Sequence, residues 1–227
     1  MKEKFLCIAH RGASFYEPEN TLRAFKRAIE MGCDGIELDV RRSKDGKVVV
    51  IHDESVDRTT NGKGKVSEMT LEELKKLDAG KGEKIPLLEE VLQQINSPLY
   101  FVEIKEQGYE SEVVNVVKSL GKMDEVVFIS SNQESLKRVN ESGGKHLGLI
   151  LTSATKAKLE YVLPHFSLVN RIILSQFKGS KVIPWVINDI ETLERMIGLG
   201  VDGIVTDKPD LMKQLKRIIK KTHLSQI

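Results

Sequence analysis

The sequence reads Gly32-Cys33-Asp34-Gly35-Ile36-Glu37-Leu38-Asp39, and a similar stretch returns as Gly200-Val201-Asp202-Gly203-Ile204-Val205-Thr206-Asp207. Five of the eight positions are identical. Each stretch follows a helical pattern and leads into a short apolar run that is typical of a buried strand. The same helix–turn–strand unit is therefore expected twice, as in a fold built from β/α units.

Short β-branched runs alternate with longer helical patterns along the rest of the chain. The expected main strands are Phe5–Ala9, Gly35–Val40, Leu99–Ile104, Val126–Ile129, Leu147–Leu151, Leu168–Ile173, Val182–Ile187 and Gly203–Val205. The expected helices are Thr21–Met31, Leu71–Lys76, Leu87–Gln94, Ser111–Leu120, Gln133–Ser142, Lys156–Leu163, Glu191–Leu199 and Asp210–Lys220. Eight strands in this order predict an α/β fold, a TIM (β/α)₈ barrel. An open doubly wound sheet is the alternative, but no Gly-x-Gly-x-x-Gly turn opens a helix.

Two regions depart from this alternation of strands and helices. A segment at about residues 41–85 follows the second strand and holds an extra strand, Lys47–Ile51. Only eight residues separate Ile173 from Val182, which predicts a shortened sixth helix. We therefore expect one domain over residues 1–227, with a small insertion at about 41–85.

Composition excludes several classes of protein. The 227 residues carry 35 Lys and Arg against 33 Asp and Glu, a net charge of +2, which argues against a nucleic-acid binder. Cys7 and Cys33 cannot form a disulfide framework and are expected to be buried thiols. The apolar run Phe5–Ala9 is too short for a signal peptide, and no stretch is long enough to span a membrane. These features predict a soluble, cytoplasmic protein.

Charged side chains gather where the expected strands end. They are His10 and Arg11 after the first strand, Glu37 and Asp39 on the second, His52 after the extra strand, and Glu103 and Lys105 at the end of the third. The carboxyl ends of parallel barrel strands form one rim, where active sites lie. We therefore expect these side chains to meet.

The three carboxylates of this set have two interpretations. Glu37, Asp39 and Glu103 offer only oxygen ligands, which suit a hard divalent cation such as Mg²⁺ or Ca²⁺. Alternatively, Glu37 and Asp39 form an ion-pair network with nearby cations, namely Arg41, Arg42 or Lys105. Without a cation, three neighbouring carboxylates repel one another.

The remaining rim residues indicate phosphodiester cleavage. Imidazole exchanges protons near neutral pH, so His10 and His52 can serve as general acid and base. Arg11 and Lys105 can hold a phosphate, or else pair with rim carboxylates. No nucleophile elbow, P-loop or Cys/His cluster competes with this set.

The chain resembles the glycerophosphodiester phosphodiesterase family. The matching segments are His10–Ala13, Glu17–Thr21, Gly32–Val40, His52-Asp53, Asp57–Gly62, Ile85–Leu92, Glu103–Lys105, Trp185 and Gly200–Asp210. Their order and spacing cover nearly the whole chain.

The resemblance implies a TIM barrel that hydrolyses a glycerophosphodiester to an alcohol and glycerol 3-phosphate, in lipid and glycerol metabolism. The mechanism that the resemblance implies is attack of the glycerol 2-hydroxyl on phosphorus, after which water opens the cyclic phosphate. The implied cofactor is one divalent cation, Mg²⁺ or Ca²⁺ with Mn²⁺ as a further candidate. The implied roles are acid–base catalysis by His10 and His52, a cation site on Glu37, Asp39 and Glu103, and substrate binding by Arg11, Lys105, Glu19 and Trp185.

Two other functions stay open at this point. One is a lysophospholipase D-like activity on lysophospholipids. The other is a non-catalytic phosphate-binding barrel, which the loss of a histidine would support, but both His10 and His52 are present. A lysine-rich run over Lys213–Lys221 can contact anionic lipid, or form the solvated face of a last helix. The expected partner is a small-molecule glycerophosphodiester, without nucleic acid or stable membrane insertion. The sequence leaves the oligomeric state and the preferred alcohol open.

Overall fold

Strands and helices alternate along the computed structural model, which describes residues 4–153 and 159–214. The strands are β1 (Leu6–Ala9), β2 (Gly35–Arg42), β3 (Val48–Val50), β4 (Tyr100–Ile104), β5 (Val126–Ser130), β6 (His146–Leu151), β7 (Tyr161–Pro164), β8 (Lys181–Val182) and β9 (Gly203–Thr206). The helices are α1 (Leu22–Met31), α2 (Leu71–Lys76), α3 (Leu88–Gln94), α4 (Glu110–Ser119), α5 (Gln133–Glu141), α6 (Arg171–Gln176) and α7 (Ile190–Leu199). Two 3₁₀ turns, η1 (Val66–Glu68) and η2 (Phe166–Leu168), complete the described elements.

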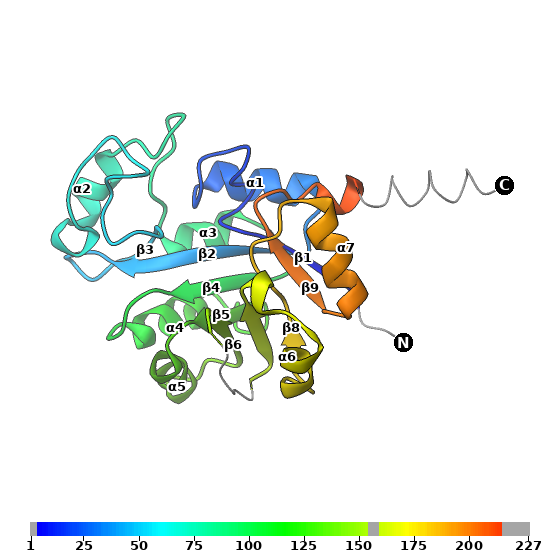
Figure 1. Ribbon diagram of the computed structural model, residues 1–227. Coiled ribbons are helices and arrows are strands. Elements are labelled where there is room, and N and C mark those ends of the chain that lie inside the picture. Colours follow the sequence, from blue (N-terminus) through cyan, green and yellow to red (C-terminus); the bar gives the residue numbers. More distant parts are fainter. Residues whose placement is uncertain (1–3, 154–158, 215–227) are drawn as a thin grey trace.

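Eight strands form a parallel sheet in the order β8–β7–β6–β5–β4–β2–β1–β9. The two ends of this order are joined by backbone hydrogen bonds of 2.9 Å, from Asp202 to Val182 and from Val205 to Pro184. The helices lie outside the strands (Figure 1). The sheet thus closes into the expected TIM barrel.

The two similar stretches form the same local structure. Gly32 ends α1 and Gly200 ends α7, each in the left-handed conformation with φ of 83° and 84°. This conformation strains residues that carry a Cβ, so glycine suits both turns. Asp34 and Asp202 then each accept a hydrogen bond from a backbone N–H of a neighbouring strand, at 2.9 and 2.7 Å. The repeated helix–turn–strand unit is confirmed.

Side chains of β2 and β4 alternate between the barrel interior and the face beneath the helices. Ile36 and Leu38 of β2 join the apolar cluster under the helices. The intervening residues, Glu37 and Asp39, therefore point inward. The parallel register pairs Asp39 with Glu103, so the carboxylates of both strands reach the same level of the barrel.

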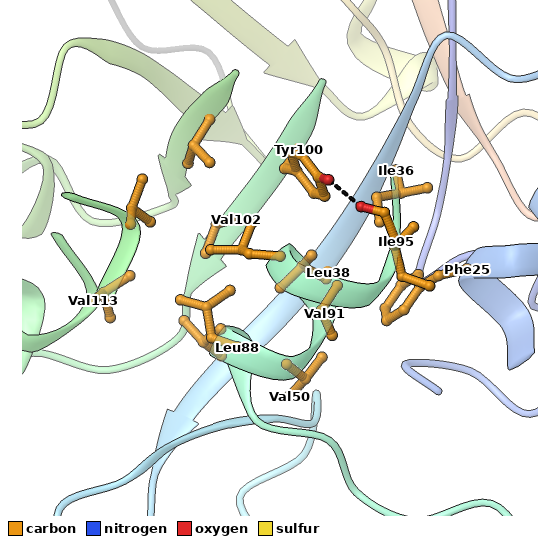
Figure 2. Packing of buried hydrophobic residues seen from close by; sticks show 14 of the residues in the cluster. Phe25, Ile36, Leu38, Val50, Leu88, Val91, Ile95, Tyr100, Val102 and Val113 are labelled. Carbon is orange, nitrogen blue, oxygen red and sulfur yellow. Dashed lines mark hydrogen bonds between the residues drawn. The ribbon is translucent and has the colours of Figure 1, made fainter. Parts of the chain in front are cut away.

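Helix α3 is fixed over these two strands. Figure 2 shows its residues Leu88 and Val91 beside Leu38, within one buried cluster. The buried Tyr100 hydroxyl donates to the carbonyl of Ile95, directly after α3. Burial of each large apolar side chain stabilises the fold by about 1.5–3 kcal/mol. This packing holds the β2 and β4 ends that carry the carboxylates.

The segment after β2 forms the expected insertion. Strand β3 pairs antiparallel with β2, and α2 lies beyond the end of β2 (Figure 1). The insertion has a small apolar cluster of its own, which consists of Val49, Ile51, Val56, Val66, Leu74, Ala79 and Ile85. Because this cluster includes Ile51, directly after β3, the next residue, His52, is held near the barrel rim.

The structure corrects two expected elements. Residues 168–173, predicted as a strand, run from the end of η2 into the start of α6. The sixth barrel strand is instead β7 (Tyr161–Pro164), which overlaps the end of the predicted helix 156–163. The Asn170 side chain accepts hydrogen bonds of 3.0 Å from the N–H groups of Ile172 and Ile173, which starts a helix in an apolar run typical of a strand. Helix α6 has six residues, so the sixth helix is short as predicted.

The helices of the described residues have at most ten residues each. None of them has the length and apolar character needed to cross a membrane. Most of the expected helix 210–220 and of its lysine-rich run lies outside the described residues.

Candidate active site

His10 follows β1, and a carboxylate holds its ring. Nδ1 lies 2.7 Å from Oδ1 of Asp207, at the end of β9. The Ser14 hydroxyl donates to the same oxygen at 2.9 Å, and the Asn188 amide donates to Oδ2 at 2.6 Å. Burial favours a higher pKa for Asp207, but hydrogen bonds with His10, Asn188 and Ser14 lower this pKa to about 2. An ionised Asp207 accepts the Nδ1 proton, which leaves Nε2 of His10 to exchange protons.

His52 has the same arrangement with different partners. Its Nδ1 lies 2.6 Å from Oδ1 of Asp53, and its carbonyl accepts a 2.8 Å hydrogen bond from Nε of Arg41. Arg58 donates to both oxygens of Asp53, at 2.7 and 3.0 Å, and holds the pKa of Asp53 well below its usual range. Burial lowers the pKa of His52, although Asp39 and Asp53 oppose this shift. Both imidazoles are thus held at Nδ1 by an ionised carboxylate.

Glu37, Asp39 and Glu103 bring their oxygens within 4.8 Å of one another. Burial and the charges of Asp39 and Glu103 raise the pKa of Glu37 well above its ordinary value. Burial and Asp39 also raise the pKa of Glu103, to about 7. Burial favours a higher pKa for Asp39 too, but Arg11 and Lys105 outweigh it and lower this pKa. The cluster therefore carries more negative charge than its surroundings stabilise.

This cluster fits a divalent cation. Among the described residues, Oδ1 of Asp39 is a buried oxygen without a hydrogen-bond partner, although Nζ of Lys105 lies 3.5 Å away. A cation there would satisfy this oxygen and reduce the repulsion that raises the pKa values of Glu37 and Glu103. Three carboxylates, with no sulfur ligand, suit a hard ion such as Mg²⁺ or Ca²⁺.

Arg11 links the first loop to the acidic cluster. Its backbone N–H donates to Glu37 at 3.0 Å, and its Nε lies 3.2 Å from Oδ2 of Asp39. Its Nη1 donates to Glu19 at 3.0 Å. Lys105 donates to Glu103 at 2.8 Å. Burial favours lower pKa values for both cations, but the surrounding carboxylates raise them, so both side chains are charged.

A pocket of about 200 Å³ opens between these groups. One side is charged, and the other is formed mainly by apolar side chains of β5, β6, β7 and β9 and of the segment after β8. The lining residues are His10, Arg11, Glu37, His52, Glu103, Lys105, Ile129, Ser131, Ile150, Thr152, Leu163, Trp185 and Val205. The pocket can therefore hold a small molecule that combines an anionic group with a less polar part.

Seven of the nine predicted site residues line this pocket. They are His10, Arg11, Glu37, His52, Glu103, Lys105 and Trp185. Asp39 is buried among them, with its side chain 1% exposed. Glu19 does not line the pocket but contacts Arg11 and Arg58. Trp185 forms part of the apolar wall and donates to the Leu163 carbonyl at 2.8 Å.

Sequence reasoning missed residues that hold the site together. Asp207 was recognised only as the end of the second similar stretch, where it matches Asp39. Asn20 was noted within a motif, but its buried side chain donates to Asp39 at 2.8 Å. Arg58 was likewise noted without a role. The signal for Asp207 was its position at a strand end, the same feature that identified Asp39.

The chain is similar to proteins of one family. Residues 10–211 match the model of the "Glycerophosphoryl diester phosphodiesterase family". A glycerophosphodiester phosphodiesterase of Caldanaerobacter subterraneus subsp. tengcongensis is 42% identical over 94% of this chain and 98% of its own length. The crystal structure of a glycerophosphodiester phosphodiesterase from Agrobacterium tumefaciens has a TM-score of 0.80 and 31% identity, over 91% of this chain and 98% of that one.

A further solved structure carries a ligand. It is an Oleispira antarctica phosphodiesterase in complex with the product sn-glycerol-3-phosphate, 29% identical with a TM-score of 0.83. The similarity covers 92% of this chain and 95% of that protein.

Proposed function

We propose, because the chain belongs to the glycerophosphoryl diester phosphodiesterase family, that its rim hydrolyses glycerophosphodiesters to an alcohol and glycerol 3-phosphate. The chain is an enzyme, a hydrolase of phosphoric diesters. The proposal assigns acid–base catalysis to His10 and His52 and a divalent-cation site to Glu37, Asp39 and Glu103.

One observation carries the proposal. Two imidazoles, each bonded at Nδ1 to a carboxylate, line the same pocket as Arg11, Lys105 and two carboxylates of the acidic cluster. Cleavage of a diester needs one proton removed and one supplied, together with positive charge near the phosphoryl oxygens. The pocket provides groups of each kind.

In the proposed first step, one histidine accepts the proton of the glycerol 2-hydroxyl as its oxygen bonds to phosphorus. The bond from phosphorus to the alcohol oxygen breaks, and the other histidine donates a proton to that oxygen. A cyclic glycerol phosphate and a free alcohol result. Each positioned proton transfer contributes roughly 10²- to 10⁴-fold to the rate.

In the second step, water attacks phosphorus and opens the ring to glycerol 3-phosphate. The histidine that lost a proton accepts one from water, and the other returns its proton to the 2-hydroxyl. Arg11 and Lys105 would hold the phosphoryl oxygens during both steps. A bound Mg²⁺ or Ca²⁺ would supply positive charge that polarises a phosphoryl oxygen.

The proposal includes the domain organisation. Residues 1–227 form one catalytic domain, in which the insertion at about 41–85 contributes His52. The substrate is a small glycerophosphodiester. A cytoplasmic location stays a prediction from the sequence.

The test is release of glycerol 3-phosphate by the purified protein. Glycerophosphocholine and glycerophosphoethanolamine are offered with Mg²⁺, Ca²⁺ or Mn²⁺, and product is measured with a coupled dehydrogenase. We expect release only in the presence of a divalent cation. Full activity after exhaustive chelation would exclude the cation from the proposal. Lysophospholipids in the same panel test the alternative lysophospholipase D-like activity.

Variants test the residue roles separately. His10→Ala and His52→Ala should each lower kcat by about 10²-fold or more, since each removes one proton transfer. His146→Ala is the matched control, because this histidine also bonds a carboxylate, Glu160, at 2.7 Å but does not line the pocket. Undiminished activity in both His10→Ala and His52→Ala would overturn the acid–base assignment.

A further inference from the structure

An unbroken series of hydrogen bonds runs between His52 and Arg11. His52 bonds Asp53, Asp53 bonds Arg58, Arg58 bonds Glu19, and Glu19 bonds Arg11. From Asp53 to Arg11 the members alternate between negative and positive groups, and the His52 ring ends the series. His52 and Arg58 belong to the insertion, whereas Glu19 and Arg11 belong to the loop between β1 and α1. The series therefore crosses from one chain segment to the other.

Arg58 is the only member of the series that bonds two carboxylates through both of their oxygens. It donates to Asp53 at 2.7 and 3.0 Å and to Glu19 at 2.8 and 2.8 Å. Only a guanidinium has enough donors, in a fixed plane, to make four such bonds at once. A lysine at this position could offer a single point of charge.

Arg58 differs from an ordinary surface arginine in what it contacts. Its side chain is 49% exposed, but Asp53 and Glu19 are only 28% and 20% exposed. Arg42, the last residue of β2, is 47% exposed, and its Nη1 lies 3.4 Å from a carboxylate of Glu112 that is 41% exposed. An ion pair between two exposed groups contributes little to stability. The partners of Arg58 are half-buried instead, and they bond His52 and Arg11, which line the pocket.

We propose that Arg58 is a positioning residue that fixes the His52 ring relative to the loop carrying Arg11. By occupying both oxygens of Asp53, it holds that carboxylate against Nδ1 of His52. By occupying both oxygens of Glu19, it joins this assembly to the barrel. Because the inference concerns His52 as a proton-transfer group, it rests on the proposed function.

The experiment compares Arg58→Ala with the matched control Arg42→Ala. Loss of Arg58 releases Asp53, and small misplacements of a reacting group cost about 10- to 100-fold in rate. We expect kcat for glycerophosphocholine to fall by this factor in Arg58→Ala, with a smaller change in KM, and to stay at the wild-type value in Arg42→Ala. Guanidinium ion, well below denaturing concentrations, should restore part of the lost kcat, because the site is half-exposed.

A second measurement does not depend on activity. In ¹H–¹⁵N spectra of the imidazoles, the wild type should show His52 with its proton on Nδ1, and Arg58→Ala should show a mixture of the two tautomers. Arg42→Ala should match the wild type. Adding Arg58→Ala to His52→Ala should lower kcat no further, because both changes act on the same proton transfer.

Two results would overturn the inference. One is a kcat in Arg58→Ala equal to that of Arg42→Ala, while His52→Ala is impaired. The other is an unchanged His52 tautomer in Arg58→Ala. If the wild type releases no product at all, the proposed function fails, and the tautomer of His52 still decides whether Arg58 holds its ring.

Discussion

The two similar helix–turn–strand units, residues 32–39 and 200–207, have the same structure at the base of the barrel and different surroundings at its rim. At the base, Asp34 and Asp202 each accept a backbone hydrogen bond from a neighbouring strand, at 2.9 and 2.7 Å. At the rim, the last residue of the first unit, Asp39, is buried among Glu37, Glu103 and two cations. The last residue of the second unit, Asp207, binds His10 instead.

Neighbouring strands explain this difference. Strand β2 lies between β1 and β4, so Asp39 faces Glu103 across a parallel register. Strand β9 pairs with β1, so Asp207 meets the residue that follows β1. The Asp39 side chain is 1% exposed and that of Asp207 is 27% exposed. One local motif thus supplies a candidate metal ligand in one place and an imidazole partner in the other.

The largest effect is expected from Asp39→Asn. This change removes a negative charge from the proposed cation site. A bound cation contributes several kcal/mol to transition-state stabilisation, so kcat/KM should fall by about 10³-fold. Binding of Ca²⁺ or Mg²⁺, measured by calorimetry, should weaken in parallel. Unaltered cation binding would show that Asp39 is not a ligand.

A smaller effect is expected from Asp207→Asn. This variant keeps the shape of the side chain but loses the ionised acceptor for Nδ1 of His10, so kcat should fall by about 10²-fold. In contrast to Asp39→Asn, cation affinity should stay at the wild-type value. A matching loss of cation affinity would mean that the two aspartates do not have separate roles.

The two rim regions should also respond to pH in opposite directions. The pKa of Glu103 is raised from 4.5 to about 7, so without a cation the free energy of unfolding should fall as pH rises through this range. The pKa of Asp207 is lowered from 3.8 to about 2, so its stabilisation is present above pH 3.8 and lost as pH falls toward 2. Urea unfolding in chelator at pH 5 and pH 8 measures the first effect.

Glu103→Gln is the control for this pH dependence. It should reduce the difference in stability between pH 5 and pH 8, and Ca²⁺ should stabilise the wild type more at pH 8 than at pH 5. An equal difference in the wild type and in Glu103→Gln would assign the effect to other groups.

The smallest effect on activity is expected at the base of the units. Asp34→Ala and Asp202→Ala each remove the side-chain acceptor of a backbone hydrogen bond, which costs about 1–3 kcal/mol of stability. Urea unfolding should detect this loss, while kcat and cation binding of the folded protein stay at wild-type values. A tenfold loss of kcat in either variant would contradict the separation between base and rim.

Much of the site could be predicted because its residues lie at strand ends. Side chains two residues apart on a strand share a face, which placed Glu37 beside Asp39 and Glu103 beside Lys105. Residues Leu168–Ile173 were predicted as a strand, because short apolar runs have no distinguishing period. The Asn170 cap, visible only through its hydrogen bonds, starts helix α6 within this run.

The sequence by itself determined the barrel class, the two repeated turns and the charged residues at the strand ends, because these depend on periods and turn preferences within a few residues. The tertiary structure alone decided what each of these residues contacts. His10 and Asp207 are 197 residues apart in the sequence, and Arg58 and Glu19 are 39 apart. Such pairs meet only because the barrel closes and the insertion packs on its rim, and no local pattern encodes that contact.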